Sequence, residues 1–323
     1  MTTRVGFFPQ NNTLWVARHR DLLPAVEWVD LNSLGRGERV DPMKALPSAH
    51  GDHLFDGGYD FIGTGSTPPV TAQAKGHDIV YVAISGPRVE NGRLVVRDDS
   101  PIGSVAELKG RRVALGHGSW QTTLLLLALE RAGLAWGDIV PVDAYGNAAE
   151  LLVNGDVDAW VGSYPYLTPV ESRTRTLVET DGLFSHRSLW FTRRDFALAR
   201  PDELARIVTA LQGADRWTEE HPREAAALFD GDLDAWEHAL RTRPWGLRPV
   251  SAEFVAEQQH AADLFHANGL IEREISVADA VLPEIGDLVA RTIPEIGDLV
   301  ARTISDPVTR TLSENGAPVT RTR

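Results

Sequence analysis

The sequence contains no cysteine, and this absence excludes several classes of site at once. Without a thiol among its 323 residues, the chain forms no disulfide, has no thiolate nucleophile and cannot hold zinc or an iron–sulfur cluster through sulfur. Long apolar runs are missing as well. The longest, Leu124–Leu129, is far shorter than the ~20 residues that a membrane-spanning helix needs. We therefore expect no membrane span.

Positive charge is scarce. The chain has 32 Lys and Arg against 45 Asp and Glu, a formal net charge of −13. Because nucleic acids need a positive protein face, we expect no nucleic-acid partner. Apolar residues are plentiful by contrast: a hydrophobic fraction of 43% with nine Trp and ten Phe is enough to fill the cores of two domains or of one two-lobed unit. We expect this unit to be a monomer.

The motifs of common nucleotide and hydrolase sites are missing too. Gly63-Thr64-Gly65 lacks the third glycine of a dinucleotide-binding loop, and no Gly-Lys-Ser/Thr phosphate loop is present. In Gly116–Trp120 the serine follows the second glycine, so the segment is not the nucleophile elbow of the hydrolases. The sequence therefore predicts no cofactor.

Short β-rich runs alternate with helical patterns along the first half of the chain. Strands are predicted at Val5–Phe8, Val26–Leu31, Tyr59–Gly63 and Asp78–Ile84, and helices at Thr13–Leu23 and Pro68–Lys75. The same rhythm returns between Arg93 and Gly162, and helical spacing dominates from Pro201 to Asn268. This order predicts an α/β fold with mostly parallel sheets, in two lobes around a ligand cleft.

The C-terminal part is repetitive. Pro283–Ile293 and Pro294–Ile304 are the same eleven residues in tandem. A period of eleven suits a right-handed coiled coil, but each copy carries a Pro and a Gly that interrupt a continuous helix. We therefore expect residues 283–323 to form a flexible tail, the alternative being a partner-binding arm.

Three junctions share one design, in which a strand ends, small polar residues follow and a helix begins. They are Pro9–Thr13, Gly63–Pro69 and Gly116–Thr122. The first turn of a helix has unpaired N–H groups and a partial positive charge, and glycine lets a ligand approach the backbone. Each junction alone can be a simple helix cap, but three of them predict an anion site that needs no Lys or Arg. The predicted ligand-binding residues are Gln10, Asn11, Asn12, Gly65, Ser66, Thr67, Gly118 and Ser119.

Aromatic and histidine residues supply further candidates. Trp120 and Tyr164 are predicted to pack on the organic part of the ligand, whereas Trp160 and Tyr166 are candidates for either the pocket or the core. His50, Asp52, His53 and Asp56 lie in a Gly-rich segment that we read as a solvated loop, so no metal site is predicted. If the protein were an enzyme, His53, His117 and His186 would be its candidate proton carriers.

From Val5 to about Leu282 the chain resembles the solute-binding proteins of ABC importers of the aliphatic sulfonate and nitrate/taurine type. The matching segments are Tyr59–Pro69, Asp99–Gly110, Asn154–Trp160, Ala214–Trp217 and Glu257–Gln259. The resemblance implies a type II periplasmic-binding-protein-like fold. Lobe one would hold residues 1–87 and 190–282, lobe two residues 88–189, with crossings near residues 85–88 and 185–189.

The resemblance also implies a function. The chain would bind a small organic anion (an organosulfonate, sulfinate or carboxylate) and pass it to an ABC permease. The same family contains a cytosolic enzyme, 2′-hydroxybiphenyl-2-sulfinate desulfinase, which Val96–Ile102 and Gly118–Trp120 resemble. That enzyme acts through a cysteine where this chain has Gln10–Asn12, and its pocket arginine falls at about Ile62. We therefore favour a carrier, with a C–S lyase on the same scaffold as the alternative.

The N-terminus carries no recognisable export signal, since polar Gln10–Thr13 follows the first predicted strand at once. As it stands, the sequence predicts a cytoplasmic location. Export to the periplasm or cell surface is the expectation if the start is truncated.

Overall fold

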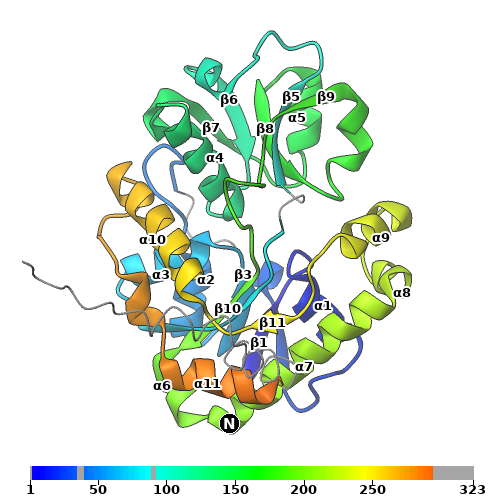
Figure 1. Cartoon of the computed structure of the whole chain (residues 1–323), viewed down its shortest axis with the longest axis vertical. Coiled ribbons are helices and arrows are strands. Elements are labelled where there is room, and N and C mark those ends of the chain that lie inside the picture. Colours follow the sequence, from blue (N-terminus) through cyan, green and yellow to red (C-terminus); the bar gives the residue numbers. More distant parts are fainter. Residues whose placement is uncertain (1, 35–39, 89–91, 294–323) are drawn as a thin grey trace, which may run out of the picture.

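Two β-sheets organise the computed structural model, which describes residues 2–34, 40–88 and 92–293. The first sheet has the order β11-β4-β10-β3-β1-β2 and the second the order β7-β6-β8-β5-β9. Their strands are β1 (Arg4–Phe7), β2 (Glu27–Asp30), β3 (Phe61–Thr64), β4 (Ile79–Ser85), β5 (Gly92–Arg97), β6 (Arg112–Leu115), β7 (Val140–Asp143), β8 (Ala159–Ser163), β9 (Thr174–Glu179), β10 (Leu189–Arg193) and β11 (Leu247–Arg248). Each sheet with its helices forms one lobe, here lobe one and lobe two (Figure 1). The predicted two-lobed α/β fold is confirmed.

The sheets are mixed rather than purely parallel. β1 pairs in parallel with β2 and β3, and β6 with β7 and β8. β10, however, runs antiparallel to β3 and β4, β11 runs antiparallel to β4, and β5 runs antiparallel to β8 and β9. The prediction of mostly parallel sheets is wrong for these pairs. β5 and β10 enter their sheets directly from the other lobe, without a crossover helix, and therefore run against their neighbours.

Helices cover both faces of the first sheet. α1 (Asn12–His19), α7 (Pro201–Glu220), α8 (Pro222–Ala226), α9 (Leu233–Arg241) and α11 (Pro283–Thr292) lie on one face, with α2 (Ala49–Phe55), α3 (Thr67–Ala74) and α10 (Ala252–Ala267) on the other. α6 (Arg194–Ala199) follows β10, and short 3₁₀ turns are η1 (Leu31–Ser33), η2 (Val105–Leu108), η3 (Trp136–Asp138), η4 (Thr168–Arg173) and η5 (Val277–Ala280). Alternate residues of β4 serve the two faces: Ile79 and Tyr81 join one apolar cluster, Val80 and Val82 the other. This double burial explains the uninterrupted apolar run of β4.

Lobe two contains α4 (Trp120–Arg131) and α5 (Ala148–Asn154). Every residue of Leu124–Leu129 in α4 is buried. One side of α4 packs on β8, and the other meets α3 and α10 of lobe one. This apolar run therefore lies in a helix that joins the cores of both lobes in one apolar cluster.

The two segments that connect the lobes run side by side. The backbone N–H of Ser85 donates to the carbonyl of Ser188 at 2.9 Å, and that of Arg88 donates to the carbonyl of Ser185 at 3.1 Å. Figure 1 shows both segments passing between the lobes. They bring the end of β4 and the beginning of β10 to the edge of lobe one that faces lobe two.

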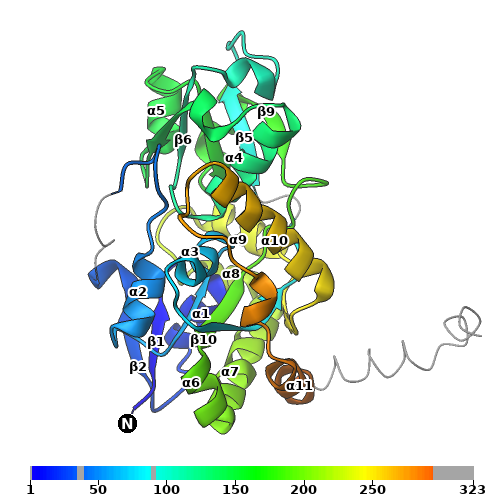
Figure 2. The same ribbon diagram turned by 90° about the vertical axis from the view of Figure 1, so that its left-hand side faces the viewer.

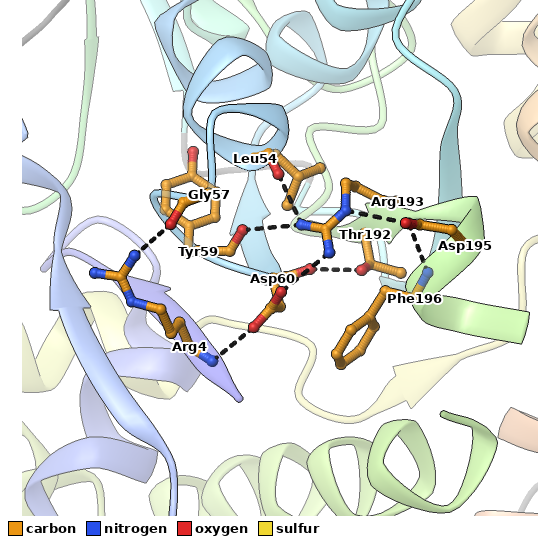
Figure 3. A network of polar contacts seen from close by, with 9 residues as sticks. All are labelled: Arg4, Leu54, Gly57, Tyr59, Asp60, Thr192, Arg193, Asp195 and Phe196. Atoms are coloured by element: carbon orange, nitrogen blue, oxygen red, sulfur yellow. Dashed lines mark hydrogen bonds and ion pairs between the residues drawn. The ribbon is translucent and has the colours of Figure 1, made fainter. Parts of the chain in front are cut away.

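The opposite edge of the first sheet is held by a polar network (Figure 3). The guanidinium of Arg193 lies 3.1 Å from the carboxylate of Asp60 and donates at 2.8 Å to the carbonyl of Leu54. The same carboxylate accepts from the backbone N–H of Arg4 at 2.9 Å. Because these charged groups are paired with one another, the network has a structural role and ties together β1, β3 and β10.

The segment around His50 and His53 is a helix, α2, so the prediction of a loop there is wrong. Gly51 permits this helix, because a Cβ there would lie only 2.6 Å from Cβ of Ala72 in α3. The carboxylate of Asp52 is engaged by Lys75 at 2.8 Å and by His77 at 2.9 Å. The described residues contain no group of three or more residues able to hold a metal ion.

The first copy of the eleven-residue repeat is α11, not part of a flexible tail. Ile285, Leu288, Val289 and Ile293 are buried against lobe one, and Figure 2 shows α11 beside α7. Pro283 stands in the first turn, where it costs no hydrogen bond. The second copy, residues 294–304, lies outside the described residues.

The repeat offers a matched test of this packing. Because Ile285 is 3% exposed, Ile285→Ala should lower the free energy of unfolding by about 2–5 kcal/mol. Only one copy occupies this position on lobe one, so the equivalent change Ile296→Ala should leave it unaltered. Chemical denaturation of both variants measures the difference. Equal losses would show that α11 is not the docked copy.

Candidate functional site

The predicted starts of α3 and α4 meet directly, from opposite lobes. The hydroxyl of Thr67 donates to the carbonyl of Ser119 at 2.7 Å. The hydroxyl of Thr123 lies 2.9 Å from that of Ser66 and 3.1 Å from that of Thr67. Ser66, Thr67 and Ser119 are thus brought together, and their hydrogen bonds hold the lobes in a closed arrangement.

The glycines at these starts allow close contact between parts of the protein. A Cβ at Gly65 would lie 3.1 Å from Cβ of Trp120, across the lobe boundary. Gly118 has a φ of +80° and packs on the ring of Pro47 from lobe one. Ser119 caps α4, accepting from the backbone N–H of Gln121 at 3.2 Å.

The start of α1 has a different environment. Asn11 caps the helix, its Oδ1 accepting from the backbone N–H of Leu14 at 3.1 Å. This bond fixes the amide, and its Nδ2 is buried without a hydrogen-bond partner beside Gly63. Nε1 of Trp190, next to the same glycine, also has no partner. Two N–H donors therefore remain unsatisfied near the first turn of α1, whose own N–H groups lack intrahelical acceptors.

Two arginines that the sequence analysis did not select stand at the same edge of lobe one. Arg88 follows β4 and is 8% exposed, with its guanidinium donating to the hydroxyl of Ser188. Arg243 precedes β11 and is partly buried. Its guanidinium lies over the ring of Trp245, 5.8 Å from the centroid, and forms no hydrogen bond or ion pair within the described part of the chain. Burial lowers the pKa of Arg243 to about 10. Burial and then the charge of Arg243 hold the pKa of Arg88 well below its usual range.

One carboxylate interacts electrostatically with these two cations. Asp215 of α7 is 1% exposed and accepts from the hydroxyl of Thr13 at 2.6 Å and from the backbone N–H of Gly246 at 3.0 Å. Burial raises its pKa to about 6, while the hydrogen bonds and both arginines oppose that rise. At neutral pH the group of Arg88, Arg243 and Asp215, here the arginine cluster, therefore carries one net positive charge.

His186 adjoins the arginine cluster but adds no charge. Its ring stacks on Trp120 with centroids 3.9 Å apart. Burial, followed by the charges of Arg88 and Arg243, holds its pKa well below the usual value. His186 is thus a neutral ring at neutral pH, and Trp120 packs on it rather than standing free.

Tyr164 and Tyr166 reach from lobe two toward lobe one. The hydroxyl of Tyr164 donates to Glu171, and its ring lies 6.0 Å from that of His238 in α9. Tyr166 is 46% exposed, and burial raises its pKa, while Gln10 and Arg243 lie close enough to oppose that rise in part. Trp160, in contrast, is buried in the core of lobe two.

The other two candidate histidines have structural surroundings. Nε2 of His117 lies 2.6 Å from the carbonyl of Ala45, and burial lowers the pKa of this imidazole. The ring of His53 lies on α2, 6.5 Å from that of Tyr59. Neither contact involves the arginine cluster.

Sequence reasoning missed Arg243 because its position depends on β11. This strand has two residues and pairs with β4, which brings the preceding loop to the carboxyl end of β4. In open α/β sheets, ligands bind at the carboxyl ends of the strands. The only local signal was an arginine in a Pro- and Trp-containing turn after a helix.

The two sheets, their paired connections and the facing carboxyl edges define the fold of the periplasmic binding proteins. The solved structure of the periplasmic aliphatic sulphonate binding protein SsuA from Escherichia coli superposes with a TM-score of 0.75 and 28% identity, over 87% of this chain and 91% of that one. The chain belongs to the NMT1/THI5 like family, whose model matches residues 45–225.

Two curated relatives mark the range of similarity. A protein of Escherichia coli (strain K12), described as an aliphatic sulfonates-binding protein, is 31% identical over 233 residues, which are 70% of this chain and 73% of the relative. The 2′-hydroxybiphenyl-2-sulfinate desulfinase of Rhodococcus erythropolis is 24% identical over 43% of this chain and 53% of the enzyme. The desulfinase is thus the more distant of the two. Within the described residues, no helix is long and apolar enough to cross a membrane.

The inter-lobe hydroxyl contacts make a direct prediction. Thr123→Val removes the partner of two buried hydroxyls, so it should lower the free energy of unfolding by about 1–3 kcal/mol. The control is Thr209→Val on the exposed side of α7, for which we expect less than about 0.5 kcal/mol. Urea unfolding of both variants gives the comparison. A neutral Thr123→Val would mean that the lobes do not meet through these side chains.

Proposed function

We propose that this protein is the solute-binding component of an ABC importer and holds a small organic anion, an aliphatic sulfonate, between its lobes. The observation that carries the proposal is the guanidinium of Arg243, a cation between the lobes that forms no ion pair with any described residue. The carboxylate of Asp215 offsets only one of the two arginine charges, so one positive charge stays unmatched in a partly buried place. A sulfonate would supply both the opposite charge and the acceptor oxygens.

The surroundings of Arg243 favour a single negative charge. With Asp215 ionised, the arginine cluster has one positive charge to neutralise. The first turn of α1 and Nδ2 of Asn11 add hydrogen-bond donors without adding a full charge. A sulfonate has one negative charge and three acceptor oxygens, which matches this set.

The predicted residues divide into two roles in this proposal. Gln10, Asn11 and Asn12 would contact the anion, and Trp120 and Tyr164 its organic part. Gly65, Ser66, Thr67, Gly118 and Ser119 would instead hold the two lobes together beside it. Closure would exclude water and so strengthen each hydrogen bond to the ligand.

The relatives support the transport role and a location. The sulfonate-binding relatives of this chain include a protein described as periplasmic. We accordingly propose an exported protein that works with a membrane permease, rather than the cytoplasmic location that the sequence as written predicts.

A carrier and an enzyme differ in what they leave bound. We expect native mass spectrometry of the protein incubated with propane-1-sulfonate and with an aromatic sulfinate to show intact ligand on the protein. The free ligand in the same samples should be unchanged in mass. Release of sulfite from either compound would replace the carrier with the C–S lyase alternative.

Substitution of Arg243 tests its proposed role in binding the anion. Because a charged hydrogen bond contributes about 1.5–3 kcal/mol, Arg243→Gln should weaken sulfonate binding roughly tenfold to hundredfold. Arg241→Gln, an exposed arginine two residues away that pairs with Glu237, is the matched control and should bind as the unaltered protein does. Isothermal titration calorimetry measures both. Equal affinity of the two variants would remove Arg243 from the site.

A further inference from the structure

Asp215 lies in the segment Ala214–Trp217, which the proposed function leaves without a role. It is a buried carboxylate in a site that is proposed to bind anions. Its negative charge repels an anionic ligand, so it lowers affinity unless it also selects among ligands. Its two oxygens are held from two sides, by Thr13 at the start of α1 and by Gly246 in the loop that carries Arg243. It therefore cannot swing away from the arginines when a ligand binds.

If the site binds an anion, the negative charge of Asp215 affects which anions it accepts. Resting on the proposed function, we propose that Asp215 determines the charge of the accepted ligand, admitting singly charged tetrahedral anions such as sulfonates and rejecting doubly charged ones such as phosphate monoesters. Asp215 acts through Arg243 and Arg88 and is a specificity-determining residue without direct contact to the ligand.

Charge balance in a buried place sets this preference. The two arginines and Asp215 leave one positive charge, which a monoanion neutralises. A dianion would leave one uncompensated negative charge beside the carboxylate of Asp215, and like charges repel strongly where water is excluded. Without Asp215 the two arginines would match a dianion.

The other titratable groups that face the cluster do not alter this balance. His186, from the connection between lobes, is neutral because burial and both arginines lower its pKa. Tyr166, from lobe two, has its pKa raised by burial and is also neutral. Among these described groups, Asp215 is therefore the one whose charge changes near neutral pH, since its pKa is raised to about 6.

Two probes of equal size separate the charges. Propane-1-sulfonate and ethyl phosphate have the same number of heavy atoms, but at about pH 8 the sulfonate carries one negative charge and the phosphate nearly two, because its second pKa is about 6. Their affinities for the full-length protein, for Asp215→Asn and for Asp202→Asn are measured by calorimetry. Asp202 lies exposed on the same helix, so its variant loses an equal charge away from the arginines. The amide that Asp215→Asn introduces can still accept from Gly246 and donate to Thr13.

We expect the unaltered protein and Asp202→Asn to prefer the sulfonate, and Asp215→Asn to shift the ratio toward ethyl phosphate by about tenfold or more. A merely structural role of Asp215 would weaken both ligands and leave their ratio unchanged, and that result would overturn the inference. Absence of sulfonate binding in the unaltered protein would instead refute the proposed function.

Sulfonate affinity measured as a function of pH tests the same inference on the unaltered protein. The sulfonate keeps its charge between about pH 8 and pH 5, whereas Asp215 takes up a proton on passing its pKa of about 6. Protonation removes the negative charge beside the arginines, so sulfonate affinity of the unaltered protein should rise as pH falls. In Asp215→Asn the affinity should be flat over this range. A flat profile for the unaltered protein would contradict the inference.

Discussion

The antiparallel return of the chain into the first sheet is the constraint on which the site depends. β10 enters between β3 and β4 against the direction of both, so the residues before it arrive at the carboxyl ends of those strands. β11 repeats the arrangement on the far side of β4. His186 and Arg243, distant in sequence, reach for this reason the same edge as Arg88, which follows β4. A purely parallel sheet would have needed crossover helices and would have carried these loops to the other edge.

Local features of the fold were predictable because their causes are local. Asn11 and Ser119 cap helices through bonds within three residues, and Gly155, with a φ of +80°, ends α5. Features that depend on tertiary contact were not. α2 forms because Gly51 packs on α3, α11 forms because its apolar side packs on lobe one, and β9 and β11 exist through their pairing with neighbours.

The candidate site shows the same division. The helix starts were visible as polar residues after strands, but two of the three are occupied by each other across the lobe boundary. The charges that distinguish the site, on Arg88, Arg243 and Asp215, come from three separate elements. An acidic chain with a net charge of −13 can bind an anion because buried neighbours are screened far less than surface charges. The total charge of the chain therefore did not predict the sign of the net charge at the candidate site.

The contact between α4 and α10 makes the two sides of the molecule unequal. On that side the lobes share a continuous apolar cluster, and parting them would expose leucine side chains to water at a cost of about 25 cal/mol per Å². Near α9, the lobes touch through the rings of Tyr164 and Tyr166, and Tyr166 is 46% exposed. Separation of the lobes on the α4 side should therefore cost more than separation on the tyrosine side. The lobes would open on the side of Tyr164 and Tyr166, and solute would enter there.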